Sequence, residues 1–431
     1  MEESASGALI SVDKFAGGSQ FYFLTHLHSD HTQGLTSAWS RGPLYCSKLT
    51  AKLLPPKFPD FNLSLLRVLS PGVWHSLPSS SSLHVMLLDA HHCPGAVMFL
   101  FRGEFGCWLY TGDFRWESEC ERAITGRKML LEAIKEHPVT MLYLDNTYCN
   151  PSYDFPSRDF AARQIVDIIT SHPEHDVIIG IDTLGKEDLL LYIARVLNIK
   201  IWVWPERLQT MHLLGYHDIF TTKTTQTRVR AVPRYSFSVE TLEALNTMKP
   251  TIGIMPSGLP WVMRPVSGDD NLFGSFLTSH YRRKKLSEDG GTGMGKLSGN
   301  VGCVERFHQY IFSVQYSDHS CFSEIQDFVE LVKPTNLKGI VSSSSCYVDP
   351  LYYLGRLCGI HQVSERLNYK GGRRVWRKRV AIRTKSRLQN GNLTMKRRTL
   401  RVSYCGVWAS RVGVLRRSRR GAKLVDYDST D

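Results

Sequence analysis

The stretch FYFLTHLHSDHTQG, residues 21–34, places three histidines and an aspartate within six positions: His26, His28, Asp30 and His31. Imidazole and carboxylate groups are preferred ligands of Zn²⁺ and of similar divalent metals. His26 and His28 are two residues apart at the predicted end of a strand, so their side chains point to one side. Asp30 and His31 follow in the turn and can face the other side of a small cavity. The spacing therefore predicts that this stretch contributes ligands to two adjacent metal ions.

Two metal ions need more ligands than one stretch supplies. A histidine-rich surface turn, or buried histidines held by hydrogen bonds, would give a similar composition, but four coordinating groups at this spacing favour a metal site. Polar residues that follow other apolar runs are the further candidates: His91, His92, Asp113, Asp145 and His319. Taken alone, each of them is more typical of a turn or a cap.

Short apolar runs separated by turn residues occupy the first 150 residues and predict buried or half-buried strands. The runs are FYFLT, LHVMLLDA, AVMFLF, CWLYTG and TMLYLD. Every candidate ligand up to residue 145 lies at the end of one of these runs or just after it. Rigid strands that carry polar loops are the usual means of positioning catalytic groups.

From about residue 156, helical and strand-like segments alternate, which predicts an α/β arrangement and a second domain. Residues 157–173 and 186–198 have helical apolar spacing, whereas DVIIGID, KIWVWP and TIGIMP are typical of strands. Residues 282–300 are rich in Gly, Lys and Ser without periodicity, so we expect a flexible loop. The sequence then returns to a strand in QYIFSVQYSDHS, followed by a helix and a last strand in LKGIVSS.

The net charge of +13 is concentrated in one segment. Residues 361–431 hold 20 of the 53 Lys and Arg residues but only 4 of the 40 Asp and Glu residues. Residues 1–360 therefore hold 33 basic and 36 acidic residues and are nearly neutral. Because the apolar residues of 361–431 are sparse, we expect this segment to be a disordered basic tail. Its cations would bind nucleic-acid phosphates non-specifically, and its arginine runs are typical of nuclear import signals. A solvated tail with no such role is the alternative.

The composition favours a soluble intracellular protein without a membrane partner. No apolar run approaches the ~18 residues that a membrane span needs. The first ten residues lack the basic and apolar regions of a secretory signal. The ten cysteines form no CxxC pair, which suits a reducing compartment better than a disulfide framework.

The motifs, taken in order, resemble the metallo-β-lactamase superfamily and, within it, the β-CASP nucleases. HxHxDH, a histidine before Cys-Pro-Gly, and TGD carry the first resemblance; LDNT, the α/β insert and SDHS carry the second. Over about residues 8–360 the chain is similar to the DNA crosslink-repair group that includes Apollo and Artemis, and most similar to its Apollo-like members. The resemblance implies an α/β fold, a metallo-β-lactamase αβ/βα sandwich with an inserted β-CASP domain.

The implied domain order has four parts. Residues 1–150 and 306–360 form the metallo-β-lactamase domain, residues 151–305 form the β-CASP domain with the loop at 282–300, and residues 361–431 form the tail.

The resemblance also implies which residues bind the metals. The first zinc would be bound by His26, His28, His92 and Asp113. The second metal would be bound by Asp30, His31 and the shared Asp113. His92 is preferred to His91 because it directly precedes Cys-Pro-Gly. One or two Zn²⁺ ions are expected, and the second site would also accept Mn²⁺ or Mg²⁺.

The expected catalytic residues are Asp13, Asp30, Asp145 and His319. Asp13 would orient the metal site from outside it, and Asp145 would lie beside the metals. His319 would either stand by the leaving group or complete the weaker metal site. The group's motifs further suggest a substrate phosphate pocket formed by Thr183, Lys186, Ser317 and Ser320. Lys186 is equally typical of a solvated lysine at the start of a helix.

The expected activity is that of a metal-dependent phosphodiesterase, because two metals ~4 Å apart can activate water and neutralise charge on a phosphoryl group. RNA-cutting relatives carry a further histidine in the last strand, where this chain has Val341, which favours DNA. The resemblance implies a nuclear 5′→3′ exonuclease that acts on single-stranded DNA or DNA ends and prefers a 5′-phosphate. Crosslink repair, double-strand breaks and telomere ends are the implied settings, with repair or telomere proteins as partners.

Three alternatives remain: an RNA-processing β-CASP endonuclease, a small-molecule metallohydrolase such as a lactamase or thioesterase, and a catalytically silent scaffold.

Overall fold

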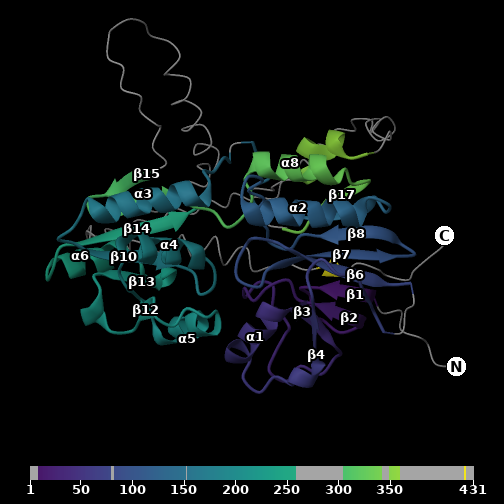
Figure 1. Ribbon diagram of the computed structural model, residues 1–431, viewed down its shortest axis with the longest axis horizontal. Helices are drawn as coiled ribbons and strands as arrows, with labels where there is room; N and C mark the ends of the chain where they lie inside the picture. Colours follow the sequence, from purple (N-terminus) through teal and green to yellow (C-terminus); the bar gives the residue numbers. More distant parts are fainter. Residues whose placement is uncertain are drawn as a thin grey trace, which may run out of the picture.

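Three β-sheets and the helices packed on them make up the fold (Figure 1). The computed structural model describes residues 8–78, 82–151, 153–258, 304–341, 349–359 and 422–423. The mixed α/β architecture confirms the predicted fold class. None of the helices in these ranges combines the length and the apolar composition that a membrane span requires.

The first sheet has five strands in the order β18-β1-β2-β3-β4. Strands β1 to β4 pair in parallel, and β18 pairs antiparallel with β1. Helix α1 packs against β3 and β4 of this sheet and lies to their left in Figure 1. The bounds are β1 Ala8–Val12, β2 Ser19–Phe23, β3 Leu44–Ser47, α1 Lys48–Lys57, β4 Leu66–Leu69 and β18 Ala422–Lys423.

The second sheet has six strands in the order β17-β9-β8-β7-β6-β5. Strands β5 to β8 pair antiparallel, whereas β9 and β17 run parallel to β8. Helices α2 and α8 cover its outer face (Figure 1). The bounds are β5 His75–Ser76, β6 His84–Asp89, β7 Val97–Gly103, β8 Gly106–Tyr110, α2 Glu121–Ile134, β9 Val139–Leu144, α8 Phe322–Val332, β17 Asn336–Gly339 and α9 Pro350–Leu354.

These two sheets pack face to face, and the sequence of β7 shows why. Val97, Phe99 and Phe101 point into the core between the sheets, whereas Met98 and Leu100 point to the helices on the other side. A strand whose residues are apolar on both faces is buried on both faces. The sandwich between two helical layers is the αβ/βα arrangement that the sequence predicted.

The third sheet has seven strands in the order β12-β11-β13-β10-β14-β16-β15. All pairings are parallel except β15 with β16. All six residues of the central strand β10 are buried. The bounds are α3 Arg158–Thr170, β10 Asp176–Ile181, α4 Glu187–Leu197, β11 Ile201–Trp202, α5 Pro205–Leu213, β12 Phe220–Thr221, β13 Val229–Pro233, α6 Val239–Asn246, β14 Thr251–Ser257, β15 Val304–His308 and β16 Ile311–Gln315.

We propose a domain division that differs slightly from the one expected from the sequence. Strands β15 and β16 belong to the seven-stranded sheet, because β16 pairs with β14. We therefore propose that the inserted domain extends to Gln315, and that the segment returning to the first domain begins after it. The expected loop at 282–300 lies outside the described residues. So does most of the tail at 361–431, of which only Ala422 and Lys423 are described; they form β18 and depart from the expectation of disorder.

Candidate metal centre

Five chain segments meet at one end of the two-sheet sandwich, each directly after a strand. Residues 25–31 follow β2, residues 91–93 follow β6, residues 111–116 follow β8, residues 145–147 follow β9, and residues 317–320 follow β16. The segments therefore come from all three sheets. Because the strands fix where each segment begins, polar groups far apart in the sequence converge here.

Three imidazole nitrogens converge on one point. His28 Nδ1 lies 3.0 Å from His26 Nε2 and 3.1 Å from His92 Nε2. Nitrogen ligands at about 2.05 Å from a tetrahedral zinc would stand roughly 3.3 Å apart. The Asp113 carboxylate lies next to them, with Oδ2 at 3.8 Å from His26 Nε2 and 3.6 Å from His92 Nε2. Three imidazoles and a carboxylate at these distances fit a bound metal ion.

Asp113 faces two groups of histidines with its two oxygens. Oδ2 faces His26, His92 and His319, the last at 3.8 Å from His319 Nε2. Oδ1 lies 3.2 Å from His31 Nε2. Asp113 accordingly belongs to two of the three groups of potential metal ligands among the described residues, one with His26 and His31 and one with His92 and His319. A carboxylate in this position is suited to bridge two ions.

An oxygen atom stands at the outer nitrogen of each inward-facing ring. Thr25 Oγ1 donates to Asp13 Oδ2 at 2.7 Å and lies 2.9 Å from His26 Nδ1, so it accepts from that ring. His31 Nδ1 lies 2.7 Å from Asp13 Oδ2. Such partners fix the orientation and the tautomer of a ligating histidine. Asp13 is fully buried and has a positive φ of 52°, which directs its carboxylate toward the site.

Burial sets the protonation of the histidines. It lowers the pKa of His26 and, together with the charge of His319, lowers the pKa of His92 to about 3. The pKa of His28 is also lowered by burial. These rings are therefore neutral, as metal ligands must be. His31 differs, because Asp113 and Asp13 outweigh the effect of burial and raise its pKa to about 10.

His319 and Asp145 form a pair at the edge of the site. Asp145 Oδ2 lies 2.7 Å from His319 Nδ1. Asp145 Oδ1 accepts hydrogen bonds from the backbone N–H and the hydroxyl of Thr147 at 3.0 and 2.6 Å. The carboxylate therefore holds the ring so that Nε2 faces Asp113.

His91 lies outside the cluster that contains its neighbour His92. Its side chain is buried near Asp89, with 3.7 Å between His91 Nε2 and Asp89 Oδ2, and burial lowers its pKa to about 4. Among the described residues, the groups of potential metal ligands thus contain His92 and not His91. Asp30, in contrast, belongs to none of the three ligand groups among the described residues. Its charge still acts on His28, whose pKa it raises against the larger effect of burial.

Cys93 is a potential ligand that sequence reasoning did not identify. Its buried thiol groups with His26, His28 and His92. Burial raises the pKa of this thiol well above its usual value. Its position next to His92 in HHCPG was the available signal, but a lone cysteine beside an expected ligand is more typical of a packed apolar residue.

The residues expected to bind a substrate phosphate are mostly engaged within the protein. Ser317 Oγ donates to the backbone oxygen of His319 at 2.8 Å and accepts from its N–H at 3.0 Å. Ser320 Oγ accepts from the N–H of Trp116 at 2.9 Å. Both hydroxyls are buried and shape the Ser-Asp-His turn. Thr183 is exposed, so its side chain remains accessible.

Lys186 is a buried, ion-paired residue. Its Nζ lies 2.9 Å from Asp318 Oδ2 and 3.0 Å from Asp182 Oδ2. Burial would lower the pKa of this ammonium, but the two carboxylates raise it. A substrate phosphate would compete with both carboxylates. The prediction of a phosphate contact therefore stays a prediction, whereas the alternative of a solvated lysine is wrong because only 8% of Lys186 is exposed.

A buried arginine below the site was also not identified from the sequence. Arg115 is fully buried, and its Nε lies 2.9 Å from Glu324 Oε2 of α8. Its Nη1 donates to the backbone oxygen of Ser317 at 2.9 Å. Arg115 thus ties the segment after β8 to the segment after β16.

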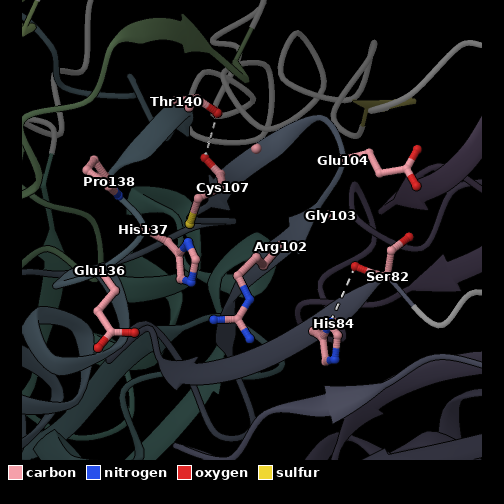
Figure 2. Close-up of a pocket in the computed structure, with 11 residues that line it drawn as sticks. Ser82, His84, Arg102, Gly103, Glu104, Cys107, Glu136, His137, Pro138 and Thr140 are labelled. Atoms are coloured by element: carbon pink, nitrogen blue, oxygen red, sulfur yellow. Dashed lines mark hydrogen bonds between the residues drawn. The ribbon is translucent and has the colours of Figure 1, made fainter.

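A separate cavity of about 520 Å³ lies at the other end of the six-stranded sheet, beside the β7–β8 turn (Figure 2). Arg102, His84 and His137 are among the side chains that line it. None of the residues that line it belongs to the metal centre, so it is a distinct feature of the surface.

Comparison with known proteins agrees with this geometry. A family model described as DNA repair metallo-β-lactamase matches residues 216–345. The 5′ exonuclease Apollo of Gallus gallus is 38% identical over 354 residues, which are 81% of this chain and 65% of that protein. The DNA cross-link repair protein SNM1 of Arabidopsis thaliana is 31% identical over 360 residues, 79% of this chain and 65% of that protein. The DNA cross-link repair 1A protein of Homo sapiens is 31% identical over 345 residues, 77% of this chain and 29% of that protein.

The fold and the site together define the class, which is a metallo-β-lactamase-type sandwich with a metal site at its strand ends and an inserted α/β sheet. The chain is similar to the DNA repair metallo-β-lactamase family over residues 216–345, and to the Apollo exonucleases over most of its own length. It spans less than two thirds of the length of these relatives.

Proposed function

We propose that this chain is a zinc-dependent DNA nuclease, a 5′→3′ exonuclease that acts in the nucleus on DNA ends during crosslink repair, double-strand break processing or telomere end processing. The observation that carries the proposal is the position of Asp113, whose two oxygens face two sets of histidines. The names of the relatives, 5′ exonuclease and DNA cross-link repair protein, support the reaction and the substrate.

The proposed metal assignment follows the ring orientations. His26, His28, His92 and Asp113 would hold a zinc ion, and His31, Asp30 and Asp113 would hold a second Zn²⁺, Mn²⁺ or Mg²⁺. Bound at these positions, divalent ions supply an activated water and a counter-charge for the phosphoryl oxygens. Asp13 would act from outside the site, because it contacts His31 Nδ1 and both donors of Thr25.

His319 is the proposed proton donor to the departing 3′ oxygen. Asp145 holds its Nδ1 at 2.7 Å and leaves Nε2 facing the site. A carboxylate behind an imidazole stabilises the imidazolium form, which is the form that can donate a proton. The His319 side chain is 14% exposed, more than the buried His26 or His31, so a substrate can reach it.

DNA is the proposed substrate because no histidine occupies position 341. Val341 follows β17, and its backbone pairs with the Asn146 side chain, with 2.9 Å between Val341 N and Asn146 Oδ1. The position thus lies beside the segment that carries Asp145, where an imidazole could join the site, but a valine cannot ligate a metal. Thr183, Lys186, Ser317 and Ser320 are the proposed contacts for a 5′-phosphate. The basic residues of 361–431 would add non-specific attraction to DNA.

A nuclease assay on the full-length chain tests the proposal. Single-stranded DNA labelled at its 3′ end would be supplied with a 5′-phosphate or a 5′-hydroxyl, beside RNA of the same sequence, a β-lactam and a thioester. We expect progressive shortening of 5′-phosphorylated DNA that stops with chelator and in Asp113→Ala. Asp218→Ala, an exposed aspartate of the inserted domain, is the matched control.

Cleavage restricted to RNA would overturn the DNA assignment. Turnover of the β-lactam or the thioester without nucleic-acid cleavage would favour a small-molecule metallohydrolase. A zinc-loaded protein that acts on none of these substrates would favour a silent scaffold.

A further inference from the structure

Residues 182–187 of the inserted domain, here called the DTLGKE loop, connect β10 to α4 and contact the metal centre. The backbone oxygen of Leu184 lies 2.9 Å from His28 Nε2, across 156 positions of sequence. A carbonyl only accepts hydrogen bonds, so Nε2 carries the proton and donates it. His28 Nδ1 is therefore the free nitrogen, and this atom faces His26 and His92.

The same loop reaches His92 through an intermediate residue. Lys186 Nζ lies 2.9 Å from Asp318 Oδ2, and the backbone oxygen of Asp318 accepts from His92 Nδ1 at 2.7 Å. His92 thus also carries its proton on the outer nitrogen and presents Nε2 to the cluster. The lysine fixes the side chain of Asp318, and the backbone of the same residue fixes the ring of His92.

A buried ion pair holds the DTLGKE loop in this shape. Arg207 of α5 is fully enclosed, and its Nη2 lies 2.8 Å from Glu187 Oε1. The same guanidinium donates to the backbone oxygens of Gly185 and Thr183. Glu187 Oε1 also accepts from the N–H of Gly185 at 3.0 Å. The loop is therefore anchored within the inserted domain, independently of its contacts with the histidines.

Two consecutive residues of the loop, Gly185 and Lys186, have positive φ angles. Lys186 has a positive φ of 63°, which is uncommon for a residue with a side chain, and no side chain caps α4 at this point. Gly185 has a φ of +105°, and a Cβ there would lie 3.6 Å from Asp318 Oδ2. The left-handed turn directs the Leu184 oxygen toward His28 while Lys186 Nζ reaches Asp318. Strained conformations of this kind concentrate at functional sites.

We propose that the DTLGKE loop is a positioning element for the metal centre, in which the Leu184 oxygen orients His28 and Lys186 orients His92 through Asp318. The inference rests on the proposed function only in that it needs a metal at the histidine cluster. It assigns Lys186 a role in metal affinity, distinct from a contact with substrate. If the loop positions His28 and His92, the inserted domain must pack on the sandwich before the site reaches its full affinity for the metal.

Zinc affinity, measured without substrate, tests the proposal. Full-length Lys186→Met, Lys186→Arg and the control Lys200→Met would compete with a chromogenic chelator for zinc; Lys200 is an exposed lysine of the same domain. Groups that orient a ligating histidine typically contribute 10–100-fold to metal affinity. We expect Lys186→Met to weaken zinc binding by about 10-fold or more, Lys186→Arg to restore most of it, and Lys200→Met to match the wild type.

A double-mutant cycle identifies the route through Asp318. Asp318→Asn keeps the backbone oxygen and removes the charge, while Lys186 retains Asp182 as a partner. We expect the losses of zinc affinity in Lys186→Met and Asp318→Asn to be strongly non-additive in the double variant, because both break one link. The visible absorption of the Co²⁺-substituted proteins should change in the same variants, since it reports the ligand geometry. Should Lys186→Met not fold, Asp318→Asn alone gives the same readouts.

The outcomes separate this proposal from the proposed function. Wild-type zinc affinity and an unchanged Co²⁺ spectrum in folded Lys186→Met and Asp318→Asn would overturn the positioning role, even if nuclease activity is present. Additive losses in the double variant would overturn the route through Asp318. Absence of nuclease activity in a wild-type protein that binds zinc would overturn only the proposed function.

Discussion

Asp145 and His319 are 174 positions apart in the sequence, yet Asp145 Oδ2 and His319 Nδ1 are 2.7 Å apart. Asp145 follows β9 of the six-stranded sheet, and His319 follows β16 of the seven-stranded sheet. The contact thus joins the sandwich to the inserted sheet directly beside Asp113. The proposed proton donor is assembled from two sheets, so it depends on the correct packing of those sheets.

Asp145→Asn should reduce the rate of DNA cleavage by about 10²–10⁴-fold, which is the usual contribution of general acid–base catalysis. The substitution replaces the carboxylate that contacts His319 Nδ1 by a neutral amide. Zinc content should be unchanged, because Asp145 belongs to none of the ligand groups among the described residues. Single-turnover rates and metal analysis would check this, with the exposed Asp167→Asn as control. Loss of zinc together with activity would instead identify the pair as part of the metal site.

Asp113→Ala should lower the bound metal below one equivalent and abolish nuclease activity. The substitution removes the carboxylate that, among the described residues, lies within 4 Å of all four histidines His26, His31, His92 and His319. Atomic absorption on protein dialysed against low zinc would measure the stoichiometry. Two equivalents of tightly bound metal in this variant would contradict a bridging position.

Removal of the metal should lower the stability of the folded protein. A ligand that binds only the folded state stabilises it by about 2.7 kcal/mol at a free concentration 100 times its dissociation constant. Calorimetry with chelator and at rising free zinc should therefore show a melting temperature that increases with zinc concentration. In Asp113→Ala this increase should be much smaller. A melting temperature independent of zinc in the wild type would argue against a metal site in the folded state.

Lys57 should make stability increase with pH in the alkaline range. Its Nζ donates to the backbone oxygen of Leu27, between two expected ligands, and burial lowers its pKa from 10.5 to about 8. Between these values the unfolded chain binds more protons than the folded one, so the free energy of unfolding rises with pH. The gain is at most about 3 kcal/mol and is complete above pH ~10.5.

Urea unfolding of the chelator-treated wild type and Lys57→Met at pH 7.5, 9 and 10 would isolate this contribution. The difference in unfolding free energy, wild type minus variant, should increase at each step. A constant difference would show that Lys57 keeps its ordinary pKa.

Arg115→Met should destabilise the protein by about 3–5 kcal/mol, the usual cost of removing one partner of a buried ion pair. Glu324 would lose its closest cation, and the Ser317 oxygen would lose a donor. Urea unfolding would measure the loss. Arg163→Met on the exposed side of α3 should change stability by less than about 0.5 kcal/mol. A similar small change in Arg115→Met would show that the buried cation is dispensable.

Local patterns carried most of what could be predicted from the sequence. Helical apolar spacing predicted helices over 157–173 and 186–198, and the structure has α3 at Arg158–Thr170 and α4 at Glu187–Leu197. The convergence of His26, His92 and Asp113 was also expected, because each follows an apolar strand. Strand ends in one sandwich meet, so polar groups placed there meet as well.

Contacts that depend on tertiary packing could not be predicted. The backbone oxygen of Leu184 contacts His28 across 156 positions of sequence, and that of Asp318 contacts His92 across 226 positions. Because every residue has a backbone carbonyl, the residue types at 184 and 318 do not indicate these contacts. The pairing of Lys186 with Asp318 spans 132 positions. The hairpin of β15 and β16 was expected to return to the first domain, but its pairing with β14 depends on a partner strand that local sequence does not specify.

The late position of Ser317–Ser320 in the chain has a consequence for biosynthesis. A ribosome releases His26 and His28 long before the residues whose oxygens orient His28 and His92 have been made. Until that point the nascent chain lacks the backbone oxygen that fixes the tautomer of His92, so the full set of oriented imidazoles is not yet available to a metal. The geometry of the complete ligand set can form only after translation has passed β16. The proposed metal centre would therefore be complete only once Ser317–Ser320 have been synthesised, so we expect metal binding at full affinity to follow translation of this segment.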